Sequence, residues 1–269
     1  MIYDVSYSFI YITFANACLF ALSPEEIARQ SFPSSVGIYL FDEDKNPIKS
    51  GSGFFVSPGV IATNYHVIEG ASFGIAKIVG KEKKHQISNI KAVNQRIDLA
   101  LIEVSDLSIP PLFLDNGRKL SVGQKVYAIG NPQGLEGTFS EGIVSSVREV
   151  GDDYYIQMTT PISSGSSGGP VLDDRGLVVG LSVATYQNGQ NLNFAVPVKY
   201  VLELIGSPVI KSTADPFELS ASKYVGPSLF NLPSREKSTH KGNKQLHGSD
   251  DGGTKSSLNK SGDTIIMSR

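Results

Sequence analysis

The chain has 269 residues, of which 40% are hydrophobic and 19% are charged, an ordinary composition for a globular protein. Its 24 basic and 26 acidic residues give a formal net charge of -2, which argues against a protein whose main task is to bind nucleic acid. The single cysteine, Cys18, leaves the rest of the chain without an internal disulfide and without a cysteine nucleophile.

Residues 1–30 form an N-terminal apolar segment. Residues 5–24 carry no charge, and residues 15–17 (Ala-Asn-Ala) place small side chains before Cys18, as at a signal-peptidase site. The stretch is too short and too polar for a stable membrane span. We therefore expect an exported protein, in a bacterial periplasm or secreted. The alternatives are a misassigned start and an N-terminal helix packed on the body.

Short runs rich in Val, Ile, Phe and Tyr, separated by glycine and proline, predict an all-β body within residues 31–206. Six strands are expected in the first half, about residues 31–106, at 36–41, 51–56, 59–63, 73–79, 87–94 and 99–104. A linker at 105–120 follows. Six more strands are expected in the second half, about residues 119–198, at 125–129, 137–148, 154–158, 170–172, 178–184 and 193–196. The spacing at 199–205 predicts a short helix. This order predicts two six-stranded antiparallel β-barrels followed by a short C-terminal helix.

Residues 207–269 have a different composition. From residue 241 onward the chain is dense in Ser, Gly, Lys, Asn and Asp and has very few large apolar side chains. Such a segment cannot bury enough surface to offset the entropy of ordering, so we expect a disordered polar tail. A small docked extension around residues 217–232 remains the alternative.

A glycine-rich turn at residues 165–170 (Gly-Ser-Ser-Gly-Gly-Pro) is the strongest chemical signal. Attack on an acyl carbon requires a hydroxyl at a tight turn, beside backbone N–H groups that point at the developing oxyanion. Ser167 is the candidate nucleophile, and the N–H groups of Gly165 and Ser167 are the candidate oxyanion hole. A flexible Gly/Ser loop is the alternative, and the apolar strand that resumes at Val171 argues against it.

A serine nucleophile needs a base, and the chain has four histidines. His240 and His247 fall in the polar tail, and His85 follows two lysines in a polar turn. His66 follows an apolar strand and is the candidate base for Ser167. A histidine at a strand end is more often structural, but no competitor exists here.

The third member of such a site is a carboxylate that orients the imidazole and stabilises its cation. Asp98 directly precedes an apolar strand, where it either begins that strand or faces a buried partner. We select Asp98 over Asp42, Asp44, Asp106 and Asp115, which have the sequence context of ordinary turn residues.

Several stretches occur in one order along the chain and resemble the HtrA/Deg-type branch of the trypsin-like serine proteases. They are residues 51–56 (Gly-Ser-Gly-Phe-Phe-Val), 63–67 (Thr-Asn-Tyr-His-Val), 98–100 (Asp-Leu-Ala), 130–134 (Gly-Asn-Pro-Gln-Gly), 165–170 and 193–197 (Asn-Phe-Ala-Val-Pro). The resemblance spans about residues 31–206.

The resemblance implies a chymotrypsin-like fold and a serine endopeptidase in which His66 and Asp98 come from the first barrel and Ser167 from the second. Unfolded or extended polypeptides are the implied substrates, bound between the barrels as an added strand alongside residues 179–185. Hydrolysis proceeds through an acyl-enzyme. No metal or organic cofactor is expected, because Cys and His are too few for a zinc site. Relatives usually continue into a PDZ domain; the polar tail suggests a single-domain or truncated protease, and homo-oligomerisation is left open.

The sequence departs from the family at Ser164 and Ser166, where many relatives have Pro and Asn. Pro161, six residues before the candidate nucleophile, occupies the usual floor of the specificity pocket, and its lack of charge argues against a preference for Lys or Arg. Four further residues suggest an apolar pocket for small or medium aliphatic side chains. They are Val183, Ala184, Thr185 and Phe194.

Two other functions remain open from the sequence. One is a catalytically inactive peptide-binding or chaperone-like module on the same fold, since fold does not determine function. The other is an esterase or another acyl-transfer enzyme, which uses the same three residues but a closed pocket for a small molecule.

Overall fold

A computed structural model describes residues 21–105, 109–131, 137–185 and 192–207. All of them belong to one compact unit of the chain, Met1–Leu232. The predicted signal segment up to residue 20 and the predicted disordered tail from residue 208 lie outside the described residues.

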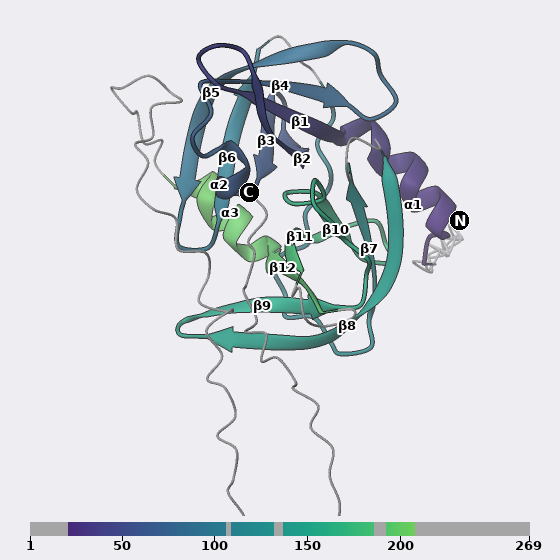
Figure 1. The fold of residues 1–269 in the computed structure, drawn as a ribbon. Helices are drawn as coiled ribbons and strands as arrows, with labels where there is room; N and C mark the ends of the chain where they lie inside the picture. Colours follow the sequence, from purple (N-terminus) through teal and green to yellow (C-terminus); the bar gives the residue numbers. More distant parts are fainter. Residues whose placement is uncertain (1–20, 106–108, 132–136, 186–191, 208–269) are drawn as a thin grey trace, which may run out of the picture. The chain divides into compact units, whose positions relative to one another are not determined.

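The first half of the chain forms a closed antiparallel barrel in the strand order β1-β2-β3-β6-β5-β4 (Figure 1). Consecutive residues of its central strands are buried on opposite sides. Phe55 and Ile61 belong to the cluster inside the barrel, whereas their neighbours Phe54 and Ala62 belong to a cluster shared with the second barrel. This explains why these strands read as continuous apolar runs. The strands are β1 (Ser35–Phe41), β2 (Pro47–Ser57), β3 (Val60–Thr63), β4 (Phe73–Ile78), β5 (Lys84–Asn94) and β6 (Leu99–Val104).

The second half forms another closed antiparallel barrel, in the order β10-β11-β12-β9-β8-β7. Its interior contains Val126, Val144, Ile156 and Val171 among other apolar side chains. The strands are β7 (Lys125–Gly130), β8 (Thr138–Val150), β9 (Asp153–Met158), β10 (Pro170–Leu172), β11 (Val178–Thr185) and β12 (Asn193–Pro197). The predicted fold of two six-stranded barrels is therefore confirmed, with strand bounds that differ by only a few residues.

One apolar cluster joins the two barrels. It includes Phe54 and Leu101 from the first barrel together with Tyr127, Leu172 and Leu181 from the second. The predicted C-terminal helix is present as α3 (Val198–Gly206), and it contacts β5 and β6 as well as β11 and β12. Both the core and the last helix therefore hold the two barrels against each other.

The helix α1 (Pro24–Ser31) lies at the end of the predicted N-terminal segment, where a helix packed on the body was one of the alternatives. The Ser23 hydroxyl accepts from the Glu26 N–H, and the Glu26 carboxylate accepts from the Ser23 N–H, which together form a capping box. Ile27 is completely buried in the cluster that joins the barrels. A 3-10 turn, η1 (Phe32–Ser34), leads from α1 into β1. The signal for this helix was present as Ser-Pro-Glu-Glu at residues 23–26.

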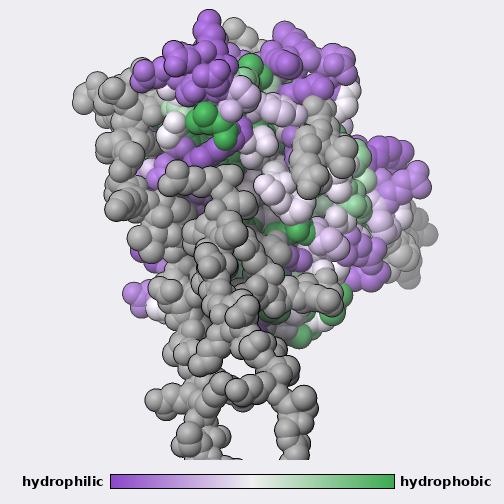
Figure 2. All heavy atoms as spheres, in the orientation of Figure 1, coloured by the Kyte–Doolittle hydropathy of each residue, from purple (hydrophilic) through white to green (hydrophobic). Residues whose placement is uncertain are grey.

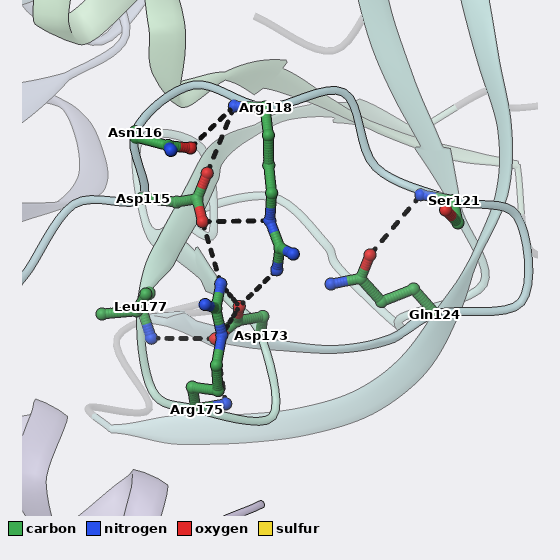
Figure 3. A network of polar contacts seen from close by, with 8 residues as sticks. All are labelled: Asp115, Asn116, Arg118, Ser121, Gln124, Asp173, Arg175 and Leu177. Carbon is green, nitrogen blue, oxygen red and sulfur yellow. Dashed lines mark hydrogen bonds and ion pairs between the residues drawn. The ribbon is translucent and has the colours of Figure 1, made fainter. Parts of the chain in front are cut away.

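A network of ion pairs connects two segments of the chain (Figure 3). Asp115 and Arg118 belong to the linker between the barrels, and Asp173 and Arg175 belong to the turn between β10 and β11. The Asp115 carboxylate accepts from Arg175 at 2.9 Å and from Arg118 at 3.1 Å. The Asp173 carboxylate accepts from the same two arginines, at 2.6 and 3.2 Å. Both carboxylates are buried, so the paired arginines offset the cost of removing their charge from water.

On the face shown in Figure 2, hydrophilic residues gather over the first barrel and apolar residues form small separate patches. The most exposed large apolar side chain of the described residues is Phe113, which is 79% exposed. No helix within the described part of the chain is long and apolar enough to cross a membrane.

Candidate active site

The glycine-rich turn lies between β9 and β10, where the second barrel meets β2 of the first. Gly165 and Gly168 have φ values of 91° and 86°, in the region that glycine alone adopts at little cost. A Cβ on Gly168 would lie 2.3 Å from the carbonyl oxygen of Ser52. The turn therefore needs glycine there both for its backbone conformation and for its close approach to the first barrel.

Ser167 is held between the two barrels by its backbone. Its carbonyl accepts from the Ser52 N–H on β2 at 2.8 Å, and the next N–H, that of Gly168, donates to the Ser182 carbonyl on β11 at 2.8 Å. The Ser167 hydroxyl donates to the Val183 carbonyl at 3.4 Å. Among the described residues, no hydrogen bond uses the N–H of Gly165 or of Ser167. These two donors are therefore available to an oxygen of a bound molecule.

His66 is placed by a short helix, α2 (Tyr65–Ile68), that directly follows β3. The backbone N–H of His66 donates to Asp98 Oδ1 at 2.8 Å, and its ring Nδ1 lies 2.6 Å from Asp98 Oδ2. An ionised carboxylate only accepts hydrogen bonds, so the neutral ring carries its proton on Nδ1. Nε2 is then the ring nitrogen that can take up a proton, and the His66 side chain is 33% exposed.

Asp98 has a left-handed backbone conformation, with φ of 58°, which aspartate tolerates better than most residues. Its N–H donates to the Gln95 carbonyl at 3.2 Å, and its carbonyl accepts from the Asn64 side-chain amide at 2.8 Å. Asn64 and Asp98 are both completely buried. The structure thus selects the buried-partner interpretation of Asp98 over that of a residue that merely begins β6.

Gly51 separates the serine turn from the histidine helix. A Cβ on Gly51 would lie 2.6 Å from Val67 Cγ1, next to His66, and 3.3 Å from the Ser167 carbonyl oxygen. The backbone of Ser167 and the helix that bears His66 therefore both pack closely against one glycine, and Asp98 bonds to the His66 ring. The structure brings all three predicted residues to the junction of the barrels.

The predicted specificity residues do not gather around one cavity, in contrast to Ser167, His66 and Asp98, which all lie at the junction of the barrels. Pro161 is exposed and lines a cavity of about 150 Å³, and Val183 and Phe194 do not line it. Val183 and Phe194 instead belong to the apolar cluster that joins the barrels. The side chains of Ala184 and Thr185 lie outside the described part. The residues that line the cavity are Ala128, Gly130, Thr138, Ser140, Pro161, Ile162, Ser163 and Ser166.

Only part of β11 has an edge for another strand. Gly180 and Leu181 pair with β12 on one side and with β10 on the other. From Val183 onward β11 pairs with β12 alone among the described strands. The prediction that a peptide binds alongside residues 179–185 is therefore wrong for residues 180 and 181, because β10 and β12 already pair with both sides of β11 there. An added strand has room along residues 183–185.

Ser52, Asn64 and Ser182 contribute hydrogen bonds to the site but were not among the predicted site residues. The first two lie inside motifs that carried the family resemblance, but no chemistry was assigned to them. Their contacts join residues far apart in the chain; the Ser52 hydroxyl, for example, donates to the carbonyl of Gly165, 113 residues away. The described residues hold no group of three or more His, Cys, Asp or Glu side chains arranged to bind a metal.

The comparisons with known proteins agree with this geometry. Residues 51–181 match the family model of the trypsin-like peptidase domain. The chain is 34% identical over 209 residues to the chloroplastic protease Do-like 5 of Arabidopsis thaliana, covering 67% of this chain and 64% of that protein. It is 36% identical over 177 residues to a periplasmic serine endoprotease of the DegP-like type from Bartonella henselae, covering 59% and 33%.

The crystal structure of the serine endoprotease from Yersinia pestis superposes with a TM-score of 0.61 and 25% identity, covering 69% of this chain and 66% of that one. The chain spans between about a third and two thirds of the length of the two curated relatives described above. The double barrel, the glycine turn and these matches together show that the chain contains a trypsin-like peptidase domain, with relatives among the HtrA/DegP-type serine proteases.

Proposed function

We propose that this protein is a serine endopeptidase that cleaves polypeptides through an acyl-enzyme. The observation that carries the proposal is the double hydrogen bond from His66 to the buried Asp98 carboxylate, beside the turn that presents Ser167. In this mechanism Ser167 Oγ attacks the scissile carbonyl carbon while His66 Nε2 takes the hydroxyl proton. The same imidazolium then protonates the leaving amine, and a water molecule attacks the acyl-enzyme by the same route.

Asp98 keeps the imidazole in the tautomer that the reaction needs and stabilises the cation that forms. The N–H groups of Gly165 and Ser167 bind the oxyanion of the tetrahedral intermediate. A donor of this kind contributes about 100-fold to 1000-fold in kcat in comparable enzymes. Their availability among the described residues supports this role.

The substrate is an extended polypeptide that pairs with the edge of β11 at residues 183–185. The free edge at these residues supports a strand rather than a compact small molecule. The Val183 carbonyl, which accepts from Ser167 Oγ at 3.4 Å, is the natural acceptor for a substrate N–H. Substrate binding there displaces the serine hydroxyl and leaves it free to turn toward the histidine. The uncharged Pro161, which lines the cavity beside the serine turn, favours a small or medium aliphatic side chain before the cleaved bond.

The direct test is labelling with a fluorophosphonate, which reacts with an activated serine. Wild type and Ser163→Ala are expected to be labelled, whereas Ser167→Ala and His66→Ala are not. Ser163 is an exposed serine of the same turn and serves as the matched control. Equal labelling of wild type and Ser167→Ala would contradict the assignment of the nucleophile.

Digestion of a proteome-derived peptide library separates the remaining functions. If the protein is a peptidase, the product peptides have new C-termini that end in aliphatic residues, and digestion with Ser167→Ala yields no such termini. Peptide binding without cleavage would identify an inactive binding module. Turnover of small esters with no peptide cleavage would identify an esterase.

We also propose that the protein is exported. The apolar segment at residues 1–30 and the periplasmic relative support this location. Sequencing of the mature N-terminus after expression in the native host tests the proposal: cleavage before Cys18 is expected, and an intact Met1 on protein in the cytoplasm would contradict it.

A further inference from the structure

Two buried serines, one from each barrel, bind the carbonyl groups of the candidate nucleophile turn. Ser52 lies on β2 and is 2% exposed, and Ser182 lies on β11 and is completely buried. Neither had an assigned role in the sequence. Their contacts bear on the oxyanion hole because a trans peptide is planar: the direction of the Ser166 carbonyl determines the direction of the Ser167 N–H, and the peptide between Gly165 and Ser166 joins the two residues that carry the oxyanion donors.

Ser52 holds the peptide between Gly165 and Ser166. Its hydroxyl donates to the Gly165 carbonyl at 2.7 Å, while the Ser166 N–H at the other side of the same peptide donates to the Ser163 carbonyl at 2.9 Å. The Asn131 N–H donates to Ser52 Oγ at 2.9 Å. Because this N–H occupies an acceptor position of the hydroxyl, the hydroxyl proton is directed at Gly165. The peptide is thereby fixed at both ends.

Ser182 holds the next peptide, between Ser166 and Ser167. Its hydroxyl lies 2.6 Å from the Ser166 carbonyl oxygen, which also accepts from the Gly169 N–H at 3.0 Å. The Ser167 N–H belongs to this peptide and points to the opposite side, away from Ser182. It is one of the two donors that the proposed function assigns to the oxyanion.

We propose that Ser52 and Ser182 are positioning residues of the oxyanion hole: the Ser182 hydroxyl holds the Ser166 carbonyl so that the Ser167 N–H faces the substrate, and the Ser52 hydroxyl fixes the peptide between Gly165 and Ser166, which sets the position of Gly165 relative to that donor. This inference rests on the proposed peptidase function. Alanine at position 52 removes the side-chain donor of the Gly165 carbonyl, and alanine at position 182 leaves the Ser166 carbonyl with the Gly169 N–H as its remaining donor, so each peptide gains freedom to rotate. Neither serine touches the substrate, so the effect passes through the turn.

The test compares Ser52→Ala and Ser182→Ala with Ser35→Ala. Ser35 is a matched control because its buried hydroxyl also donates to a backbone carbonyl, that of Ser31 at 2.9 Å, but far from the turn in the sequence. We expect kcat to fall at least about tenfold in the first two variants, with KM changed by less than about threefold, since misplacement of an oxyanion donor acts on the transition state. Ser35→Ala keeps the wild-type kcat.

A second measurement reports on the oxyanion itself. A peptidyl trifluoromethyl ketone with ¹³C at its carbonyl forms a hemiketal with an activated serine, and the ¹³C shift follows ionisation of the hemiketal hydroxyl with pH. We expect the pKa of this hydroxyl to rise in Ser52→Ala and Ser182→Ala, because the oxyanion loses stabilisation. General destabilisation of the fold does not move this value.

Folded alanine variants with wild-type kcat and wild-type hemiketal pKa would overturn the inference. If an alanine variant does not unfold cooperatively, Ser52→Cys and Ser182→Cys replace it, since a thiol is a weaker donor of similar shape. For the cysteine variants we expect kcat and hemiketal pKa values between those of wild type and those predicted for the alanine variants. Wild-type values in both measurements would overturn the inference. Failure of the proposed function is distinguishable, because wild type itself would then form no hemiketal.

Discussion

At the scale of single residues, the unusual backbone of Asp98 determines what its carboxylate can do. In the left-handed conformation, with φ of 58°, its two oxygens reach both the backbone N–H and the ring Nδ1 of His66. The Asn64 amide stabilises this conformation by binding the Asp98 carbonyl. A single carboxylate thus orients the ring through two separate hydrogen bonds.

Asp98→Asn is expected to lower kcat by about 10⁴-fold with little change in stability. Asparagine tolerates the same backbone conformation, but its amide can hold the ring in the wrong tautomer and does not stabilise the imidazolium. Steady-state cleavage of a peptide substrate and thermal unfolding measure the two effects. Asp44→Asn, in an exposed turn, is the control, and an Asp98→Asn enzyme as active as this control would contradict the role of Asp98.

Tyr155 makes stability depend on pH in alkaline solution. Burial, followed by the charge of Asp98, raises the pKa of Tyr155 from 10.0 to about 12. The folded state therefore resists loss of the phenolic proton, so the stability contribution is fully present below pH 10 and is lost as the pH rises toward 12. The loss amounts to about 2 to 3 kcal/mol.

In Tyr155→Phe this loss is absent, so the free energy of unfolding should fall less steeply between pH 10 and pH 12 than in wild type. Urea denaturation at several pH values measures the slopes. Identical slopes in the two proteins would show that Tyr155 does not titrate in this way.

At the scale of elements, the ion-pair network attaches the linker to the turn between β10 and β11. Asp173 accepts from Arg118 and Arg175, and its other oxygen accepts from the N–H groups of Arg175 and Leu177 (Figure 3). This network stabilises the second barrel at the point where the chain enters it.

Asp173→Ala is expected to destabilise the protein by about 1 to 3 kcal/mol, because it leaves the backbone N–H groups of Arg175 and Leu177 without their acceptor. Arg118→Ala should cost about 1 kcal/mol or less, since the Arg118 side chain is 46% exposed and Arg175 still neutralises both carboxylates. Chemical denaturation measures both values. Equal losses in the two variants would contradict the importance of the buried carboxylate.

The regular elements were largely predictable. Runs such as residues 99–104 and 178–184 appear in the structure as β6 and β11, because alternating or continuous burial leaves a periodic record in the sequence. The helix α2 was not predicted, since four residues (Tyr65–Ile68) are too few to establish a helical period. The capping box of α1, formed by Ser23 and Glu26, is a local pattern that the sequence contains, although it directly follows an apolar run.

At the scale of the whole molecule, the two barrels depend on each other. The apolar cluster that joins them contains fully buried Phe54 and Leu99 from the first barrel and Leu172 and Val196 from the second. Ser52 adds hydrogen bonds across the same junction, and Arg96 pairs with Asp153 across it. Separation of the barrels would expose both the apolar and the polar groups.

We therefore expect a single cooperative unfolding transition. Far-ultraviolet circular dichroism and tyrosine fluorescence should give the same urea midpoint, and residues 21–105 expressed alone should not form a stable barrel. Two separate transitions, or a folded first barrel on its own, would contradict this coupling.

The sequence by itself determined the all-β class, the division into two sets of six strands and the identities of Ser167, His66 and Asp98 as candidates. Burial patterns, glycine turns and short motifs are local, so they can be read along the chain. Only the tertiary structure shows that the Asp98 carboxylate bonds to both the backbone N–H and the ring of His66. It also shows that β10 already pairs with β11 at residues 180 and 181, and that the hydroxyls of Ser52 and Ser182 bind carbonyl groups of the serine turn. These features are contacts between distant segments, and their geometry exists only after the barrels close.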